Sequence, residues 1–537
     1  MIKICEVFRH PGIQATIFLI TVAYTLSFCF WGRGCEDPYY WLNIYETVNI
    51  KHSLSAGTSI IGHLWGTLFG FRILPFRLLG WLCCCTALCL PFFVIVPGSD
   101  WFKACNIFPL SISMMLMGYG TFNEFSPGTL SFLFLSIIAL VLSKFWNSRN
   151  LIYPIAIGIF SGLAVWCRFP NVLVCIVILA AIFTKGILKK EDVKNCIYAA
   201  VAYIIALVLF LCFASYFTIG TFNYFEAITS SFSIGNSGGH STQSLLDGMI
   251  DGANDLLFYI AAAFLFQLFE KSKSGQNQPV FIVLVFLLFA FFLKENIGVH
   301  KWFNREFHSL ISAICICMLL LANYKLFKSP HQSKVICLDF CFLILMILPF
   351  GSDTGWLKLF PALLVPIPYM AKMLEINWKN ITGDILLIGL ICISILCYFN
   401  NNISKGSRDN LLKMTEKAEV DVLKGIHISK NNKAYINNLI NNVNQYAPKG
   451  DVIFYGDASH FAYAVTNVKR RVDHPFFCSP YDTLHISRVI QSLQEDETVL
   501  FDFEMHDYDF LHKELERLGY ALICEGENYN IFDKLRP

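Results

Sequence analysis

Charged residues are scarce in this sequence. Only 15% of the 537 residues are Asp, Glu, Lys or Arg, whereas 55% are hydrophobic, and the mean hydropathy is +0.54. Because a soluble globular protein carries about 25% charged residues, this composition excludes an ordinary soluble protein and indicates a chain that lies mostly in lipid. The net charge of +2 is too small to indicate a nucleic-acid partner.

The sequence also lacks the short motifs of several metal-binding and enzyme classes. Its 20 cysteines form no CxxC pair and no Cys/His cluster with zinc-ligand spacing. Many of them lie inside apolar runs, where a thiol acts as a small hydrophobic group. The polar C-terminal region contains no GxGxxG, P-loop or GxSxG motif. Whether Cys478 and Cys524 form a disulfide there is not readable from the sequence.

Apolar stretches of membrane-spanning length are abundant. The first, from about 13 to 31, follows Lys3 and Arg9 and has no small-residue cleavage motif after it, so we predict an uncleaved signal anchor. Further stretches lie at 76–96, 106–122, 127–145, 151–168, 170–186, 195–217, 253–270, 278–293, 306–322, 334–350, 355–372 and 380–399. The sequence therefore predicts an α-helical polytopic membrane protein with about thirteen transmembrane helices.

The distribution of Lys and Arg predicts the orientation. If the N-terminus is cytosolic, alternate short loops carry most of the cations, whereas the long opposite segment 218–252 carries none. We therefore expect a multi-pass protein of the plasma or inner membrane, with a cytosolic N-terminus and everything after about residue 400 outside the cytosol.

We predict two domains. The first is a transmembrane domain, 1–399, with long outer loops at 32–75 and 218–252. In the first loop, Asp37 as N-cap and Pro38 at the first helical position predict short helices on the membrane surface.

The second predicted domain, 400–537, is a small extracytoplasmic α/β domain that begins with Asn-rich linkers. Its alternating pattern predicts strands at 451–455, 498–502 and 521–524 and helices at 481–493 and 508–518.

Ionisable residues gather on the predicted outer side, where charge is costly near lipid and is retained mostly for function. They are Glu36, Asp37, Glu124, Arg168, His240, Lys294, His300, Lys301, Arg305 and Asp353. The cytosolic loops, in contrast, carry ordinary positively charged anchors.

This layout resembles the GT-C glycosyltransferases, the superfamily of protein O-mannosyltransferases and aminoarabinose transferases. The similar features are Glu36-Asp37-Pro38-Tyr39-Tyr40 after the first span, Glu124 in the next outer turn, Arg168-Phe169-Pro170-Asn171, and the C-terminal extracytoplasmic domain. The resemblance implies transfer of a sugar from a polyprenyl-phosphate donor, within the bilayer's outer leaflet, to a glycan, lipid or protein acceptor.

The resemblance also implies roles for single residues. We predict Asp37 and Glu124 as catalytic residues, with Asp37 as the general base that takes the proton of the acceptor hydroxyl. Glu124 would orient the acceptor or help to hold a divalent cation, and the sequence leaves any metal requirement open. The predicted substrate-binding residues are Glu36, Arg168, His240, His300, Lys301 and Asp353. Among these, Arg168 or Lys301 would stabilise the departing lipid phosphate.

Each residue also has a structural explanation that the sequence leaves open. Asp37 and Asp353 are also suited to starting helices, and Arg168 and Lys301 to anchoring span ends at the interface. Two other functions remain as alternatives: a polytopic transporter or lipid flippase, and a noncatalytic scaffold that binds lipid-linked glycans. The scarcity of charges in the middle of spans and the lack of an evident internal repeat favour the transferase over the transporter.

Overall fold

The structure is a computed structural model, and it describes most of the first half of the chain and most of the C-terminal region. The described residues are 10–33, 36–47, 55–96, 98–103, 107, 110–111, 113–115, 124–219, 332–350, 359–365, 413–456, 458–468, 483–495, 498–503, 509–526 and 529–534.

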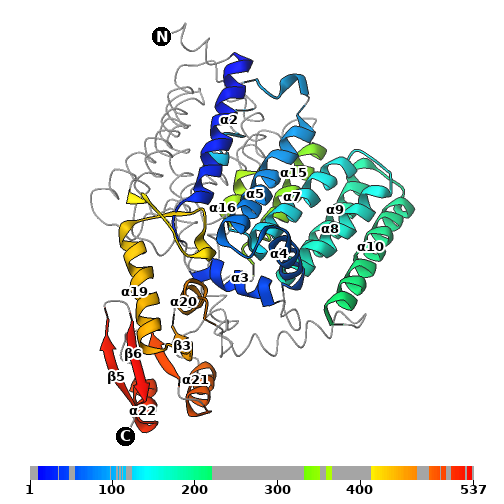
Figure 1. The fold of residues 1–537 in the computed structure, drawn as a ribbon. Helices are drawn as coiled ribbons and strands as arrows, with labels where there is room; N and C mark the ends of the chain where they lie inside the picture. Colours follow the sequence, from blue (N-terminus) through cyan, green and yellow to red (C-terminus); the bar gives the residue numbers. More distant parts are fainter. Residues whose placement is uncertain are drawn as a thin grey trace, which may run out of the picture.

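Within these residues the first part of the chain is entirely helical. Its elements are α2 (Pro11–Ser27), η1 (Phe28–Phe30), α3 (Glu36–Thr47), α4 (Ala56–Phe69), α5 (Ile73–Ile95), η2 (Gly98–Asp100), α7 (Pro127–Phe145), α8 (Ile152–Cys167), η4 (Phe169–Leu173), α9 (Val174–Lys189), α10 (Val193–Ile219), α15 (Gln332–Leu345) and α16 (Leu359–Leu364). The long helices lie side by side as a bundle (Figure 1).

Five helical segments of the described chain are long and apolar enough to cross a membrane. They are Pro11–Phe30, Ile73–Ile95, Pro127–Phe145, Phe169–Lys189 and Val193–Thr218, and two shorter apolar helices are Ile152–Cys167 and Ile336–Leu345. All seven coincide with predicted apolar stretches. The predicted spans 253–270, 278–293, 306–322 and 380–399 lie outside the described residues, and only parts of 106–122 and 355–372 are described. The total of thirteen therefore stays a prediction.

Local sequence explains where several helices begin and how closely they pack. Ser126 and Thr129 form a capping box at the start of α7, with Pro127 at the first helical position. At the α8–α10 contact, a Cβ added to Gly158 would lie 2.5 Å from the backbone oxygen of Tyr203. Only glycine permits this approach, as is common where membrane helices pack closely.

The predicted first outer loop contains the two helices α3 and α4. Helix α3 begins at Glu36, so Asp37 is the second helical residue and not the N-cap that the sequence predicts. The predicted start was two residues too late, because Asp37 and Pro38 both fit the first turn of a helix.

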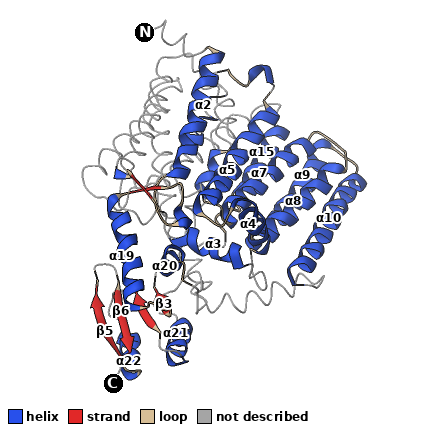
Figure 2. Cartoon of the chain, viewed as in Figure 1, coloured by secondary structure: helices blue, strands red, loops and turns tan. Residues whose placement is uncertain are grey.

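The C-terminal region forms a small α/β unit at the opposite end of the bundle from the N-terminus (Figures 1 and 2). Its elements are β1 (Glu416–Lys417), η7 (Asp421–Leu423), β2 (His427–Ile428), α19 (Lys430–Tyr446), β3 (Val452–Tyr455), α20 (Ser459–Thr466), α21 (Thr483–Glu495), β4 (Val499–Asp502), α22 (Asp509–Arg517), β5 (Tyr520–Glu525) and β6 (Asn530–Lys534).

The main sheet of this unit has the order β3-β4-β6-β5, in which β3 and β4 are parallel and the other pairs are antiparallel. Alternate residues of β3 and β4 point to opposite faces, so Phe454 and Phe501 pack in one core and Ile453 and Leu500 in another. The three predicted strands and two predicted helices are present.

Some elements of this region were not predicted. Residues 430–446 form α19, which buries Ile436, Leu439 and Val443 along one face. Strand β6 was not predicted. Cys524 lies in β5, whereas Cys478 lies outside the described residues, so their pairing stays open.

Candidate functional site at the covered end of the bundle

The helices of the predicted first outer loop contact both turns in which the sequence places candidate residues. The hydroxyl of Tyr45, in α3, donates to the backbone oxygen of Phe125 at 3.1 Å. The hydroxyl of Thr58, in α4, donates to the backbone oxygen of Cys167 at 2.9 Å. Glu124 and Arg168 directly adjoin these two acceptors. The first loop, the Glu124 turn and the Arg168 turn therefore meet at one end of the bundle.

A buried arginine lies in this region. Arg77, in the first turns of α5, has a side chain only 4% exposed, and its Nη1 donates to the backbone oxygens of Trp31 at 3.0 Å and Gly32 at 2.8 Å. Its Nη2 lies 3.8 Å from Oε1 of Glu124. One guanidinium thus joins the end of the first span to the Glu124 turn, in the multidentate way that suits arginine.

Arg168 is also buried, and its contacts are with backbone. Its Nη1 donates to the backbone oxygen of Leu348 at 2.8 Å, and its Nη2 donates to that of Phe350 at 2.5 Å. Both acceptors lie in the turns that follow α15. In the structure Arg168 therefore binds the chain just after α15, and the predicted contact with a lipid phosphate stays a prediction.

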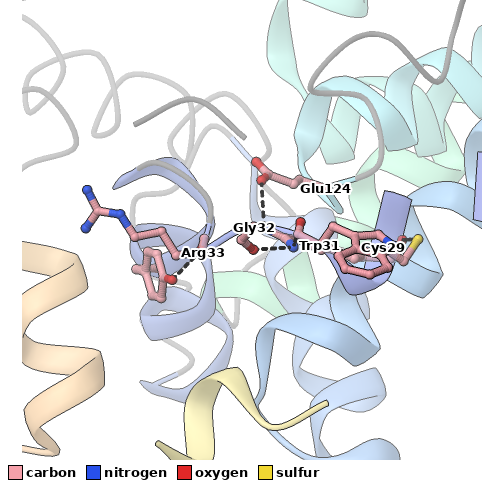
Figure 3. Close-up of polar contacts among 7 residues, drawn as sticks. Cys29, Trp31, Gly32, Arg33 and Glu124 are labelled. Atoms are coloured by element: carbon pink, nitrogen blue, oxygen red, sulfur yellow. Dashed lines mark hydrogen bonds and ion pairs between the residues drawn. The ribbon is translucent and has the colours of Figure 1, made fainter. Parts of the chain in front are cut away.

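Helix α3 carries Glu36 and Asp37 in its first turn and packs against the C-terminal unit. The hydroxyl of Tyr39 donates to the backbone oxygen of Arg33 (Figure 3). The ring of Tyr39 lies 5.0 Å from that of Phe461, and the ring of Tyr40 lies 5.1 Å from that of His460. The backbone of Asp37 is thereby placed beside α20, although the side chains of Glu36 and Asp37 lie outside the described residues.

The C-terminal unit covers this end through several further contacts. The backbone nitrogen of Gly32 donates to the backbone oxygen of His427 at 2.8 Å, and Trp31 forms a parallel bridge with the same residue. Arg33 points away from Glu124 (Figure 3), and its guanidinium lies 4.6 Å from the centre of the Phe461 ring. We call this region, from Trp31 to Phe69 with Arg77, Glu124 and Arg168, the covered end.

The sequence-predicted site residues divide into two groups. Glu124 and Arg168 lie at the covered end, and the helix of Glu36 and Asp37 does too. The other predicted residues lie outside the described part of the chain: His240, His300, Lys301 and Asp353. Within the described residues, no group of three or more His, Cys, Asp or Glu side chains could hold a metal ion.

The sequence did not predict Arg77 as a site residue, because Arg77 lies inside the predicted apolar stretch 76–96. The available signal was a single cation inside the predicted apolar run 76–96, because ionisable residues within membrane helices usually pair with other protein groups. The contacts of Arg33 and His460 with the facing domain had no comparable signal, because their partners lie far apart in the sequence.

Comparisons with known proteins show what this chain is similar to. No family model matches the chain, and no curated protein matches it. Among solved structures, the chain is similar to "Crystal Structure of ArnT from Cupriavidus metallidurans bound to Undecaprenyl phosphate", at 11% identity and a TM-score of 0.42, covering 98% of both chains. ArnT is a GT-C aminoarabinose transferase, from the group that the sequence resembles. At this identity and TM-score, neither family membership nor an activity follows from the likeness.

Proposed function

We propose that the protein is a membrane glycosyltransferase of the GT-C type, which moves a sugar from a polyprenyl-phosphate donor to an extracytoplasmic acceptor. The observation that supports this most is the covered end: an acidic first turn in α3, a carboxylate at Glu124 and a buried arginine at Arg77 occur together. They adjoin an apolar helix bundle that would accommodate a prenyl tail.

The proposed chemistry assigns proton transfer to Asp37. An acceptor hydroxyl that attacks the anomeric carbon must lose a proton, and a carboxylate within hydrogen-bond reach would accept it. Glu124 is less suited to that role, because the Arg77 guanidinium faces it at 3.8 Å and partly neutralises its charge. We therefore propose that Glu124 binds and orients the acceptor. The departing lipid phosphate requires a cation, for which Arg168 and Lys301 remain our candidates.

The proposed orientation follows from the ends of the described helices. Helix α7 begins beside Glu124 and ends with Lys144 in its last turn, and α9 begins beside Arg168 and ends with Lys189. Cations thus accumulate at the end opposite the C-terminal unit, which supports a cytosolic location for that end. We propose an extracytoplasmic domain at 400–537 and a transmembrane domain at 1–399.

Mass spectrometry of lipid-linked sugars tests the function. Cells that lack the protein should accumulate one polyprenyl-phosphate sugar, which names the donor, and wild-type protein should reverse this. The Asp37→Asn variant should fail to reverse it, whereas the matched variant Glu46→Gln, at an exposed acid in the same helix, should succeed. Full complementation by Asp37→Asn would remove the proposed base, and unchanged lipid-linked sugars in cells lacking the protein would overturn the transferase.

A transporter or flippase is the rival function. Counterflow of a labelled lipid-linked sugar in proteoliposomes, without any transfer to an acceptor, would favour it. Transfer by detergent-solubilised protein, where there is no second compartment, would favour the transferase.

A further inference from the structure

The side chain of Arg77, in α5, contacts two other parts of the chain. Its acceptors at 31 and 32 directly follow the first span, and its carboxylate partner at 124 precedes α7. The thiol of Cys29, which is fully buried, in addition lies 3.6 Å from the backbone oxygen of Arg77. The guanidinium therefore bonds to protein groups on two sides and is closed off from solvent.

The segment that Arg77 holds leads directly to the proposed base. Gly32 is followed by Arg33, whose backbone oxygen accepts from Tyr39, and α3 begins at Glu36. Only a few residues separate the carbonyl groups that Arg77 binds from Asp37. A change in the path of the chain at Trp31 and Gly32 would therefore move the first turn of α3 relative to Glu124.

We propose that Arg77 is a positioning residue for the transfer reaction. It holds the start of the first outer loop and the Glu124 turn in a fixed relation, so that the first turn of α3 keeps a fixed place relative to Glu124. This proposal rests on the proposed function for its kinetic consequence, but its structural consequence can be measured without any substrate.

Hydrogen exchange of the full-length protein in detergent measures the structural consequence. In Arg77→Gln, peptides that cover 28–40 should exchange about tenfold faster, because three charge-assisted contacts are lost. The matched control is Arg72→Gln, which removes an exposed arginine of the same region that pairs with Asp421. It should leave the exchange of 28–40 nearly unchanged. Equal exchange in Arg77→Gln and wild type would overturn the proposal.

Kinetics distinguish positioning from direct contact with the donor. With the polyprenyl-phosphate sugar that accumulates in cells lacking the protein, Arg77→Gln should lower kcat about tenfold or more while KM for that donor stays within about twofold. Arg77→Lys keeps the charge but not the planar arrangement of donors, and it should restore part of kcat. A raised KM with unchanged kcat would mean that Arg77 binds the donor, which would overturn the positioning role.

A double variant tests whether Arg77 acts through Glu124. If it does, Arg77→Gln combined with Glu124→Gln should lower kcat by little more than Glu124→Gln does. Independent, multiplicative losses would contradict the proposal. Should Arg77→Gln fail to fold, Arg77→Lys carries both the exchange and the kinetic measurements. If no lipid-linked sugar accumulates, the proposed function fails while the exchange result still decides whether Arg77 positions the loop.

Discussion

Two buried cations, Arg77 and Lys185, lie at opposite ends of the helix bundle and hold together very different parts of the chain. The Nζ of Lys185 donates to the backbone oxygen of Ser148 at 2.7 Å, pairs with Glu191 at 3.3 Å and lies 3.8 Å above the ring of Phe145. These partners belong to neighbouring helix ends and short turns. The partners of Arg77, in contrast, come from segments far apart in the sequence.

This difference indicates separate tasks for the two ends. Short connections near Lys185 leave little space for a substrate, and a local network of charges there mainly stabilises helix packing. The covered end has the long first loop, two further turns and the C-terminal α/β unit packed against them, and loops held by a rigid scaffold often have binding and catalytic roles. Variants near Lys185 should therefore lower stability alone, whereas variants at the covered end should also lower sugar transfer.

The largest expected effect on stability is at the end opposite the C-terminal unit. Among the described residues, Lys185→Met leaves the largely buried Glu191 side chain with the more distant Arg149 as its ion-pair partner, at 3.7 Å, so we expect a loss of roughly 3 kcal/mol. Thermal unfolding in detergent measures it. Adding Glu191→Gln should recover part of the loss, and transfer per folded molecule should stay at the wild-type level. A large fall in transfer would contradict the assignment of separate tasks to the two ends of the bundle.

Arg168→Gln, at the covered end, should lower stability by about 2 kcal/mol, because two carbonyl groups after α15 lose charged donors. Unlike the Lys185 variant, it should also reduce transfer per folded molecule, since it lies in the turn that contacts α4. Thermal unfolding and transfer assays on the same preparation separate the two effects. Normal transfer would assign Arg168 to structure alone.

A change midway between the two ends should affect stability only. Gly158→Ala forces α8 away from the backbone of Tyr203, and overpacking of this kind costs about 1–3 kcal/mol. Gly128→Ala is the control, because the nearest atom to its added Cβ is Oγ of Ser126 at 3.5 Å. Equal melting temperatures for the two variants would contradict the close α8–α10 packing.

The smallest expected effect is at the contact between α5 and the C-terminal unit. Arg72 and Asp421 pair at 2.8 Å but are 37% and 74% exposed, so Arg72→Gln should cost no more than about 0.5 kcal/mol. The loss should shrink further as salt is added. A salt-independent loss above that size would show that the C-terminal unit depends on this pair for its docking.

The membrane helices were the most predictable part of the fold. In lipid every backbone polar group needs an internal partner, so an apolar run of sufficient length has few choices other than a helix. The predicted stretch 76–96 accordingly corresponds to α5, Ile73–Ile95. The α/β unit was harder: α19 is rich in Asn, a weak helix former, and only the spacing of Ile436, Leu439 and Val443 indicated its buried face.

The candidate site was predictable in its location but not in its contacts. Glu124 and Arg168 were recognisable as ionisable residues next to apolar runs, which sequence alone displays. Their partners were not, because Arg168 binds backbone carbonyl groups after α15 and Glu124 faces a cation that the sequence places inside a span. Backbone acceptors carry no residue-specific signal, so no pattern in the sequence could have named them.

The bridge between Trp31 and His427 imposes an order on the assembly of the molecule. The first span leaves the ribosome long before His427, so the hydrogen bond from Gly32 to His427 can form only after residue 427 has been synthesised. Contacts between such distant residues carry a large loop-closure cost and form late. Trp31 and Gly32 therefore reach their final contacts only after residue 427 has been synthesised, and a chain truncated before that residue lacks these contacts.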